Sequence, residues 1–316
     1  MPKISVCIPT YNRVDLLPIA IESVLQQKIQ DLEIIVCDDG STDETPNLME
    51  TISDRRIRYL RHPKNIGKSN NMRSGFEAGT GEYFLKFDDD DRLTPDFIWE
   101  TSPILDRNPT IDFVGTDHWI IDSKNQRDRE ATKRNSQRWG RADLPEGIVD
   151  NLLEIVFVKQ SFQIGATLFR RCALSDVGYM RSDLQNCEDN DLFVRLALAG
   201  KKAYYLPKLL MEYRVHAEQQ GLHRAIPYLQ DKLLYLKTYQ FDSETLENIR
   251  RSRVTETQLL LGLRLIESGE TQAGRQFIAR GKAASPTKAY IGWALSWLSL
   301  DWRQKAFHVL RHIKGN

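Results

Sequence analysis

Short apolar runs alternate with amphipathic stretches through the first third of the chain. The run at 4–9 is almost continuously apolar, as expected of a strand buried on both faces of a parallel sheet. Behind it, Leu17, Ile21 and Val24 recur at the spacing of one helix face. Alternating strands and helices predict an α/β domain with a doubly wound, mostly parallel sheet. The predicted strands are 4–9, 32–37, 58–60 and 81–87, and helices are predicted at 16–25, around 48–52 and from 65 to about 79.

The pattern changes in the second third of the chain. The span 122–147 is polar and lacks apolar periodicity, so we expect a long loop there. Such a loop acts as a mobile lid, as a binding loop for a second substrate, or as a surface insertion without a role. A strand at 163–169 and a helix closed by Gly200 follow, and 211–216 is a short extended run. From about 225 onward, apolar residues recur at helical spacing, which predicts a helical C-terminal region.

Composition excludes several classes of protein. The chain has 316 residues, of which 41% are hydrophobic and 9% aromatic, as in a globular domain with a core. Its formal charge of +1 leaves no electrostatic footprint for nucleic acid. Four cysteines without a CxxC pair suggest neither a zinc site nor a disulfide framework, which favours a reducing, cytoplasmic setting. No signal peptide is evident, and no apolar run reaches the roughly 20 residues that a membrane span needs.

The C-terminal region mixes tryptophan with cations. Trp293, Trp297 and Trp302 stand close to Arg303 and Lys305. A helix of this composition can lie on an anionic bilayer surface, where amphipathic rings favour the interface. Packing against the first domain or against a partner protein is the simpler interpretation.

Four consecutive carboxylates, Asp88 to Asp91, follow the apolar strand at 81–87. Like charges this close repel each other and lose stability when they are desolvated. The run is therefore a solvated acidic turn or a cation site. Mg²⁺ and Mn²⁺ take oxygen ligands and often share them with substrate phosphates. The position directly after a buried strand favours the cation site, because open α/β sheets place their ligand crevices there.

Polar groups also follow two other predicted strands. Thr10 to Asn12 follow the first strand, and Asp38-Asp39 end the second. The C-terminal ends of parallel strands share one edge of the sheet, so we expect these groups to converge with the acidic run on one crevice. Farther along, Glu188, Asp189 and Asp191 begin a helix. Stabilisation of the helix dipole is the alternative to a chemical role for these carboxylates.

Together these segments resemble the family 2 inverting glycosyltransferases, which have the GT-A fold. The likeness covers residues 1 to about 220 and rests on the segments 5–13, 33–43, 81–91 and 188–192. The resemblance implies transfer of a sugar from a nucleoside diphosphate sugar to an acceptor hydroxyl, in cell-surface polysaccharide or glycan synthesis. It implies a GT-A domain over 1–222, with a nucleotide-sugar-binding half to about 115 and an acceptor and catalytic half from about 116, followed by a helical region over 223–316.

The resemblance also assigns roles to single residues. Tyr11 offers a ring face to the nucleotide base, and Asp39 accepts a hydrogen bond from that base. Asp88 and Asp90 occupy the outer positions of an Asp-x-Asp motif that holds Mn²⁺ or Mg²⁺. Asp90 is expected to bind the metal directly, whereas Asp88 shares it or contacts ribose or water. His216 either completes this metal site or is structural. The implied donor-binding set is Thr10, Tyr11, Asn12, Arg13, Asp39, Lys68, Asp88 and Asp89.

One position departs from the family pattern. Many relatives have Ala-Arg-Asn where this chain has Asn71-Met72-Arg73, so Met72 replaces the usual arginine. Lys68 or Arg73 would have to supply the missing cation to the donor.

The implied chemistry is a single displacement with Asp189 as the general base, which inverts the anomeric centre. A UDP-sugar is the favoured donor and a glycan or lipid-linked molecule the acceptor, with the C-terminal helices in peripheral contact with the inner face of the membrane. The alternatives are a nucleotidyltransferase and a nucleotide-sugar-binding protein without turnover. The loop after the first strand has no glycine, which disfavours a nucleotidyltransferase, and no GxGxxG motif supports a dehydrogenase.

Overall fold

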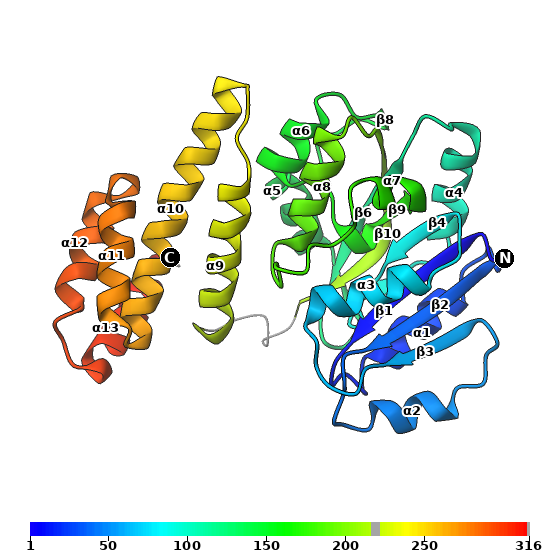
Figure 1. The fold of residues 1–316 in the computed structure, drawn as a ribbon, viewed down its shortest axis with the longest axis horizontal. Coiled ribbons are helices and arrows are strands. Elements are labelled where there is room, and N and C mark those ends of the chain that lie inside the picture. Colours follow the sequence, from blue (N-terminus) through cyan, green and yellow to red (C-terminus); the bar gives the residue numbers. More distant parts are fainter. Residues whose placement is uncertain (216–221, 315–316) are drawn as a thin grey trace. The chain divides into compact units, whose positions relative to one another are not determined.

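The computed structural model describes residues 1–215 and 222–314. The chain divides into two compact units, Met1–His216 and Ala217–Asn316 (Figure 1). His216, one of the expected metal ligands, lies outside the described residues.

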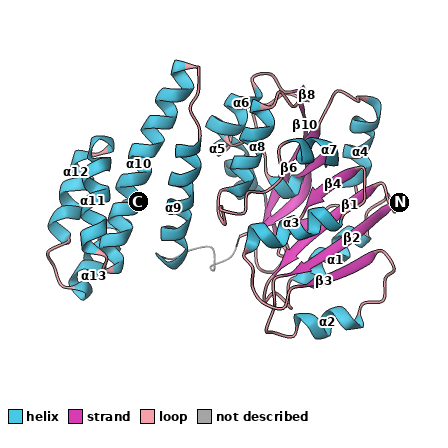
Figure 2. Cartoon of the chain, viewed as in Figure 1, coloured by secondary structure: helices cyan, strands magenta, loops and turns pink. Residues whose placement is uncertain are grey.

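The first unit is one sheet with helices packed around it (Figure 2). Its strands are β1 (Ile4–Thr10), β2 (Leu32–Asp38), β3 (Ile57–Arg61), β4 (Tyr83–Lys86), β5 (Arg92–Leu93), β6 (Phe113–Ile121), β7 (Arg127–Asp128), β8 (Gly147–Ile148), β9 (Thr167–Arg170) and β10 (Ala203–Arg214). Its α-helices are α1 (Leu17–Leu25), α2 (Thr45–Thr51), α3 (Lys68–Ala78), α4 (Phe97–Arg107), α5 (Arg129–Arg138), α6 (Leu152–Glu154), α7 (Arg171–Asp176) and α8 (Glu188–Leu198).

The sheet has the order β3-β2-β1-β4-β9-β6-β10-β5. Strands β3, β2, β1 and β4 are parallel, with Thr10 opposite Asp38 and Cys7 opposite Lys86. Strand β9 is antiparallel to both β4 and β6, and β10 is parallel to β6. The predicted mostly parallel α/β sheet is therefore confirmed, and the C-terminal ends of β1, β2, β4 and β6 lie at one edge.

Helix α3 approaches β1 and β2 closely at Gly75. A Cβ atom there would lie 2.2 Å from Cys7 Sγ and 2.7 Å from Cys37 Sγ. Only glycine lets the helix backbone lie this near the sheet. The contact fixes the start of α3, and with it Lys68, relative to the strand ends.

The expectation of a long loop over 122–147 is wrong. This span contains β7 and the helix α5, whose N-terminus is capped by the Asp128 side chain accepting from the Ala131 amide at 2.8 Å. The buried positions of α5 are Thr132 and Ser136. The Thr132 hydroxyl accepts from the Ile120 amide of β6, and the Ser136 hydroxyl donates to the Asp117 side chain of the same strand. The inner face of this helix is therefore polar and produces no apolar periodicity.

The second unit is helical, as predicted. It contains α9 (Leu222–Thr238), α10 (Glu244–Ser268), α11 (Thr271–Gly281), α12 (Pro286–Leu295) and α13 (Leu300–Lys314). Helices α10 and α11 cross where Gly262 and Gly274 face each other, and a Cβ on Gly262 would lie 2.7 Å from the Gly274 carbonyl oxygen. In the part of the chain that the structure describes, no helix is both long and apolar enough to span a membrane.

Candidate functional site

The loops that follow β1 and β2 are joined by hydrogen bonds. The Asp39 amide donates to the Thr10 carbonyl at 2.9 Å. The Asn12 amide donates to Ser41 Oγ at 2.9 Å, and Asn12 Oδ1 accepts from the Thr42 amide at 2.8 Å. Asn12 adopts a left-handed backbone with φ 54°, which asparagine tolerates better than most residues. These bonds hold the two loops side by side at the sheet edge, as the topology requires.

Asp39 has a structural contact in addition to the role expected for it. Its side chain is buried, and its Oδ1 accepts from the Ile66 amide at 2.7 Å. Burial raises the pKa of this carboxyl above its usual value, although the amides of Ile66 and Gly67 counteract the rise. Tyr11, by contrast, is 44% exposed, so its ring is accessible to a planar ligand.

The acidic run leaves the end of β4 beside these loops. The Phe87 amide donates to the Cys7 carbonyl at 2.8 Å, which extends the pairing of β1 with β4. The ammonium of buried Lys86 lies 2.6 Å from Asp88 Oδ1 and is paired with it. Burial, together with the neighbouring Asp90 carboxylate, raises the pKa of Asp89 to about 7, although the Thr10 side chain opposes the rise. Several carboxylates thus crowd one turn.

Asp91 has a different role from the rest of the run. It is fully buried, and its Oδ1 accepts from the Arg214 amide at 2.9 Å. The Arg214 guanidinium donates to the Asp90 carbonyl at 2.6 Å and to the Asp122 carbonyl at 2.9 Å. This buried arginine therefore fixes the backbone of the acidic run against β10 and the turn after β6.

The start of α8 brings a second acidic group to the same place. Lys68, at the start of α3, lies 2.6 Å from Glu188 Oε1. The Lys68 side chain is 46% exposed, and nearby carboxylates, led by Glu188, hold its pKa well above the usual value. The other two carboxylates are Asp189 and Asp88, which come from α8 and from the end of β4. Residues far apart in the sequence thus form one charged cluster.

Asp189 brings an unused acceptor to this cluster. Its Oδ1 is buried and has no hydrogen-bond partner among the described residues. Burial raises the pKa of Asp189 to about 6, while the ammonium groups of Lys86 and Lys68 limit the rise. A carboxylate in this state is still ionised at neutral pH and is a better proton acceptor than an ordinary aspartate.

Asp191 belongs to the core of the fold. It is completely buried and paired with Arg195 at 2.7 Å and with Arg181 at 3.3 Å. The Arg195 pair lies within α8, and the Arg181 pair joins α8 to the preceding loop. A carboxylate so fully engaged serves the fold, which leaves Asp189 as the candidate for proton transfer.

Lys68 and Arg73, the two cations expected to compensate for the missing arginine, have different surroundings in the structure. Arg73 donates to the carbonyls of Gly178 at 2.9 Å and Met180 at 2.8 Å, and so it anchors the loop before α8. Met72 is fully buried. Lys68 is the cation of α3 that lies with Asp88 and Asp189.

The surroundings of the acidic run suit a divalent cation bound together with a ligand. Such a cation would offset the repulsion from Asp90 and Asp88 that adds to burial in raising the pKa of Asp89. Lys86 occupies one oxygen of Asp88 and leaves the other for a metal. Mg²⁺ is commonly held by one or two carboxylates together with substrate phosphates, so Asp88 and Asp90 would suffice. Within 1–215 and 222–314, no group of three His, Cys, Asp or Glu side chains is placed to hold a metal without a ligand.

The comparisons with known proteins agree with this geometry. Residues 5–158 match the model of glycosyl transferase family 2. The chain contains a glycosyl transferase family 2 domain. It is accordingly a glycosyltransferase that uses a nucleotide sugar, as the resemblance implied, and the nucleotidyltransferase alternative is disfavoured.

Two relatives show how far the similarity extends. An uncharacterized glycosyltransferase of Haemophilus influenzae is 29% identical over 221 residues, which cover 69% of this chain and 67% of that protein. The GalNAc(5)-diNAcBac-PP-undecaprenol beta-1,3-glucosyltransferase of Campylobacter jejuni is 43% identical over 96 residues, which cover 29% of this chain and 31% of that protein. The second match therefore spans less than a third of either protein.

Two solved structures share the fold over almost the whole chain. TarS 1-349 of S. aureus in complex with UDP-GlcNAc superposes with a TM-score of 0.64 at 16% identity, covering 97% of this chain and 91% of that one. The mannosyltransferase PcManGT of Pyrobaculum calidifontis, in complex with GDP-Man and Mn²⁺, gives 0.60 at 18% identity, covering 99% and 86%. The GT-A-like arrangement with C-terminal helices is thus confirmed.

A buried polar network beside the family 2 site was not predicted from the sequence. Asp117, in β6, accepts from Arg141 Nε and from Ser136 Oγ, both at 2.6 Å. Its neighbour His118 is buried, and burial together with the Arg141 charge lowers the pKa of His118 to about 4. The His118 ring lies 5.7 Å from the ring of Tyr213. Burial raises the pKa of Tyr213 to about 12, and Asp91 and Asp88 add to the rise, so this tyrosine faces the acidic run.

The signal for this network is weak in the sequence. Asp117 and His118 interrupt an apolar strand, which marks them as unusual. Arg141 stands in the polar span that was expected to be a loop, and nothing in its neighbours indicates a buried partner. The network belongs to the half of the domain that was expected to contact the acceptor.

Proposed function

We propose that this chain transfers a sugar from a nucleoside diphosphate sugar to a hydroxyl group of a lipid-linked glycan, in a single displacement that inverts the anomeric centre. The observation that carries the proposal is the charged cluster at the sheet edge. There, a carboxylate with a free acceptor oxygen, Asp189, lies in the field of Lys68, Lys86 and Asp88. A carboxylate next to a cationic, phosphate-binding environment is what this reaction needs.

The proposed donor site uses the loops at the ends of β1 and β2. Tyr11 stacks on the base through its exposed ring, and Thr10 to Arg13 line that side of the site. Asp39 keeps its bond to the Ile66 amide and accepts from the base with its other oxygen. Lys68 exchanges part of its interaction with Glu188 for the donor diphosphate. TarS, which was solved with UDP-GlcNAc, supports a uridine nucleotide, which we take as the first donor to test.

The proposed cofactor is Mn²⁺ or Mg²⁺, held by Asp88 and Asp90. PcManGT was solved with Mn²⁺ and GDP-Man, which supports a metal in this fold. When bound, the cation would act as a Lewis acid that stabilises charge on the diphosphate. His216 remains a proposed third ligand outside the described residues.

Asp189 acts as the general base in this proposal. Its unpartnered Oδ1 accepts the proton of the acceptor hydroxyl as that oxygen attacks the anomeric carbon. The neighbouring ammonium groups of Lys86 and Lys68 keep the carboxylate ionised despite its burial. The name of the Campylobacter relative describes a glycan on undecaprenyl diphosphate, which supports an acceptor of that class.

The test compares Asp189→Asn with the wild type in sugar transfer and in donor binding. Loss of a general base lowers turnover by about 10²- to 10⁴-fold. Donor binding, measured by thermal shift with UDP-sugars and Mn²⁺, should be nearly unchanged, because Asp189 does not contact the proposed base or ribose site. Asp176→Asn is the matched control, because Asp176 is 57% exposed and paired with Lys201 on the surface.

Two outcomes would contradict the assignment. Near-normal transfer by Asp189→Asn would remove Asp189 from the chemistry. Loss of donor binding and thermal stability in that variant, with Asp176→Asn intact, would make Asp189 a structural residue. Metal-dependent donor hydrolysis by the wild type would separate an enzyme from a binding protein without turnover.

A further inference from the structure

The helix α12 carries an aromatic face that its own unit leaves uncovered. Tyr290 and Trp293 lie on α12 and Trp297 lies in the turn directly after it, and they are 77%, 51% and 66% exposed. The opposite face of α12 is already packed: Ala289 is buried, and a Cβ on Gly292 would lie 2.3 Å from Leu263 Cδ2. Trp297 contacts α11 through Arg275, whose guanidinium lies 3.9 Å from the centre of its ring, whereas Tyr290 and Trp293 lie away from the packed face of α12. Large apolar side chains gathered in the open indicate an interaction surface.

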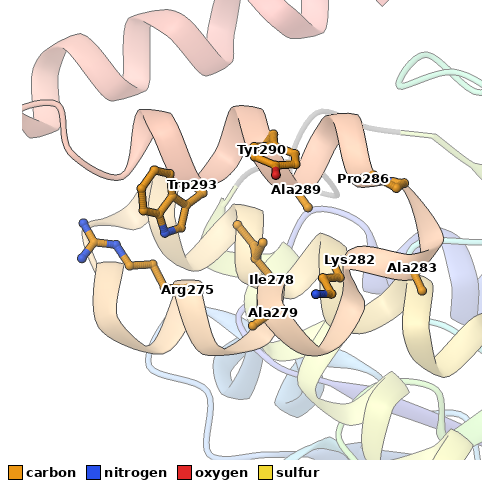
Figure 3. A pocket seen from close by; sticks show the side chains of 9 residues that line it. All are labelled: Arg275, Ile278, Ala279, Lys282, Ala283, Pro286, Ala289, Tyr290 and Trp293. Carbon is orange, nitrogen blue, oxygen red and sulfur yellow. The ribbon is translucent and has the colours of Figure 1, made fainter.

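A pocket opens between α11 and α12 beside this aromatic face (Figure 3). It has a volume of about 640 Å³, and Ile278 and Ala289 form its floor. Tyr290 and Trp293 project from α12 at one side of it, and on the other side Arg275 comes from α11 and Lys282 directly follows that helix. The pocket is thus apolar inside and cationic along one rim. It contains none of the residues of the candidate catalytic site.

The surrounding sequence has a strong basic excess. Residues 271–316 contain Asp301 as their one carboxylate side chain, against eight cations: Arg275, Arg280, Lys282, Lys288, Arg303, Lys305, Arg311 and Lys314. The whole chain has a formal charge of +1, so the rest of it is net acidic. Arg303 is an internal cation, because it is buried and donates to the carbonyls of Ile266 and Leu298. Arg280, Lys282 and Lys288 are exposed around the aromatic face.

We infer that the α11–α13 surface docks on an anionic lipid bilayer. Tryptophan and tyrosine favour the headgroup region, where the ring is apolar and its edge is wet. Exposed lysines and arginines are attracted to anionic headgroups, and the aliphatic pocket can take an acyl chain. Trp302 is 67% exposed with Lys305 5.4 Å above its ring, which repeats the pairing of cation and aromatic on α13.

Other occupants fit the surface less well. A second copy of the chain would bring two surfaces of the same positive sign together, which opposes self-association. A nucleic acid would satisfy the charge and could stack on the rings, but it leaves the exposed aliphatic residues Ile291, Leu298 and Leu300 in water. An anionic bilayer satisfies the charge, the rings and the aliphatic side chains together.

The inference goes beyond the proposed function and does not depend on it. The experiment is flotation of the full chain with vesicles of phosphatidylcholine alone and of phosphatidylcholine with phosphatidylglycerol, without any donor sugar. We expect binding to the anionic vesicles at about 0.1 M salt, and release when the salt is raised tenfold and the Debye length falls to about 3 Å. An absence of vesicle binding would not contradict the proposed donor site, and an absence of sugar transfer would not contradict vesicle binding.

Two variants test the two parts of the surface. Lys282→Gln combined with Lys288→Gln should weaken binding about 25-fold, because each basic residue near an anionic surface contributes about fivefold. Tyr290→Ala combined with Trp293→Ala should weaken binding at least tenfold at about 0.1 M salt. The matched controls are Trp99→Ala, a 54% exposed tryptophan on α4, and Lys237→Gln, an exposed lysine at the end of α9. Both controls should bind as the wild type does.

Several results would overturn the inference. These are no vesicle binding at any salt, equal binding to neutral and anionic vesicles, or wild-type binding by both double variants. Binding of a single-stranded oligonucleotide that competes fully with the anionic vesicles would assign the surface to nucleic acid. A dimer in solution that Tyr290→Ala combined with Trp293→Ala dissociates would assign it to self-association.

Discussion

The two units of this chain treat charged and aromatic side chains in opposite ways. In the first unit, charges are drawn inward and paired: Lys86 with Asp88, Arg214 with the backbone of the acidic run, and Arg141 with Asp117. In the second unit, Trp293 and Trp297 stand exposed among cations. Buried, paired charges hold a site in one geometry, whereas exposed rings and cations suit a surface that another body covers. The first unit suits the chemistry and the second the attachment that we propose for them.

The largest expected effect tests whether buried, paired charges stabilise the first unit. Replacing Arg214 by methionine should destabilise the first unit by about 3–5 kcal/mol, because it removes a buried cation beside buried carboxylates and takes away the hydrogen bonds that the guanidinium donates to the Asp90 and Asp122 carbonyls. Urea unfolding measures the loss. Arg92→Met is the control, since Arg92 is 36% exposed and lies 3.2 Å from Glu212; it should cost under about 1 kcal/mol. Equal effects in the two variants would mean that the buried arginine has no special role.

Arg214 also marks the limit of what the sequence could predict. The parallel sheet was predictable because strands buried on both faces are continuous apolar runs, as in β1 and β2. That the ends of β1, β2 and β4 lie at one edge of the sheet followed from strand direction alone. The partners of Arg214 did not, because Asp90, Asp122 and β10 are brought together by the register of the sheet, which no local pattern encodes.

The helix α5 shows a second limit. Helix prediction relies on an apolar face, but α5 attaches to β6 through the hydroxyls of Thr132 and Ser136. For the same reason the network around Asp117 was missed, because its members are polar residues from two elements. Recognition of Asp189 as a candidate base came from the family resemblance, and its spatial relation to Lys68 came from the structure.

A smaller effect concerns the pH dependence of sugar transfer. Burial raises the pKa of Asp189 to about 6, and only the deprotonated carboxylate can accept a proton. The ratio kcat/KM should therefore be level above that pH and fall as pH drops through it, by about tenfold for each further unit. Measurement of kcat/KM from pH 5 to 8 checks this. An inflection near pH 4 would instead indicate an ordinary, solvated aspartate as the base.

The smallest expected effect tests whether the exposed Trp293 ring contributes to the stability of the second unit. Trp293→Ala should change the free energy of unfolding by less than about 0.5 kcal/mol, because the ring is 51% exposed and α12 is attached by its other face. Ile278→Ala, at the floor of the same pocket, should cost about 2–5 kcal/mol, because Ile278 is 4% exposed and packs in the helical core. Urea unfolding of both variants tests the difference. A Trp293 variant as unstable as the Ile278 variant would show that the ring belongs to the core, and the surface argument for α12 would fail with it.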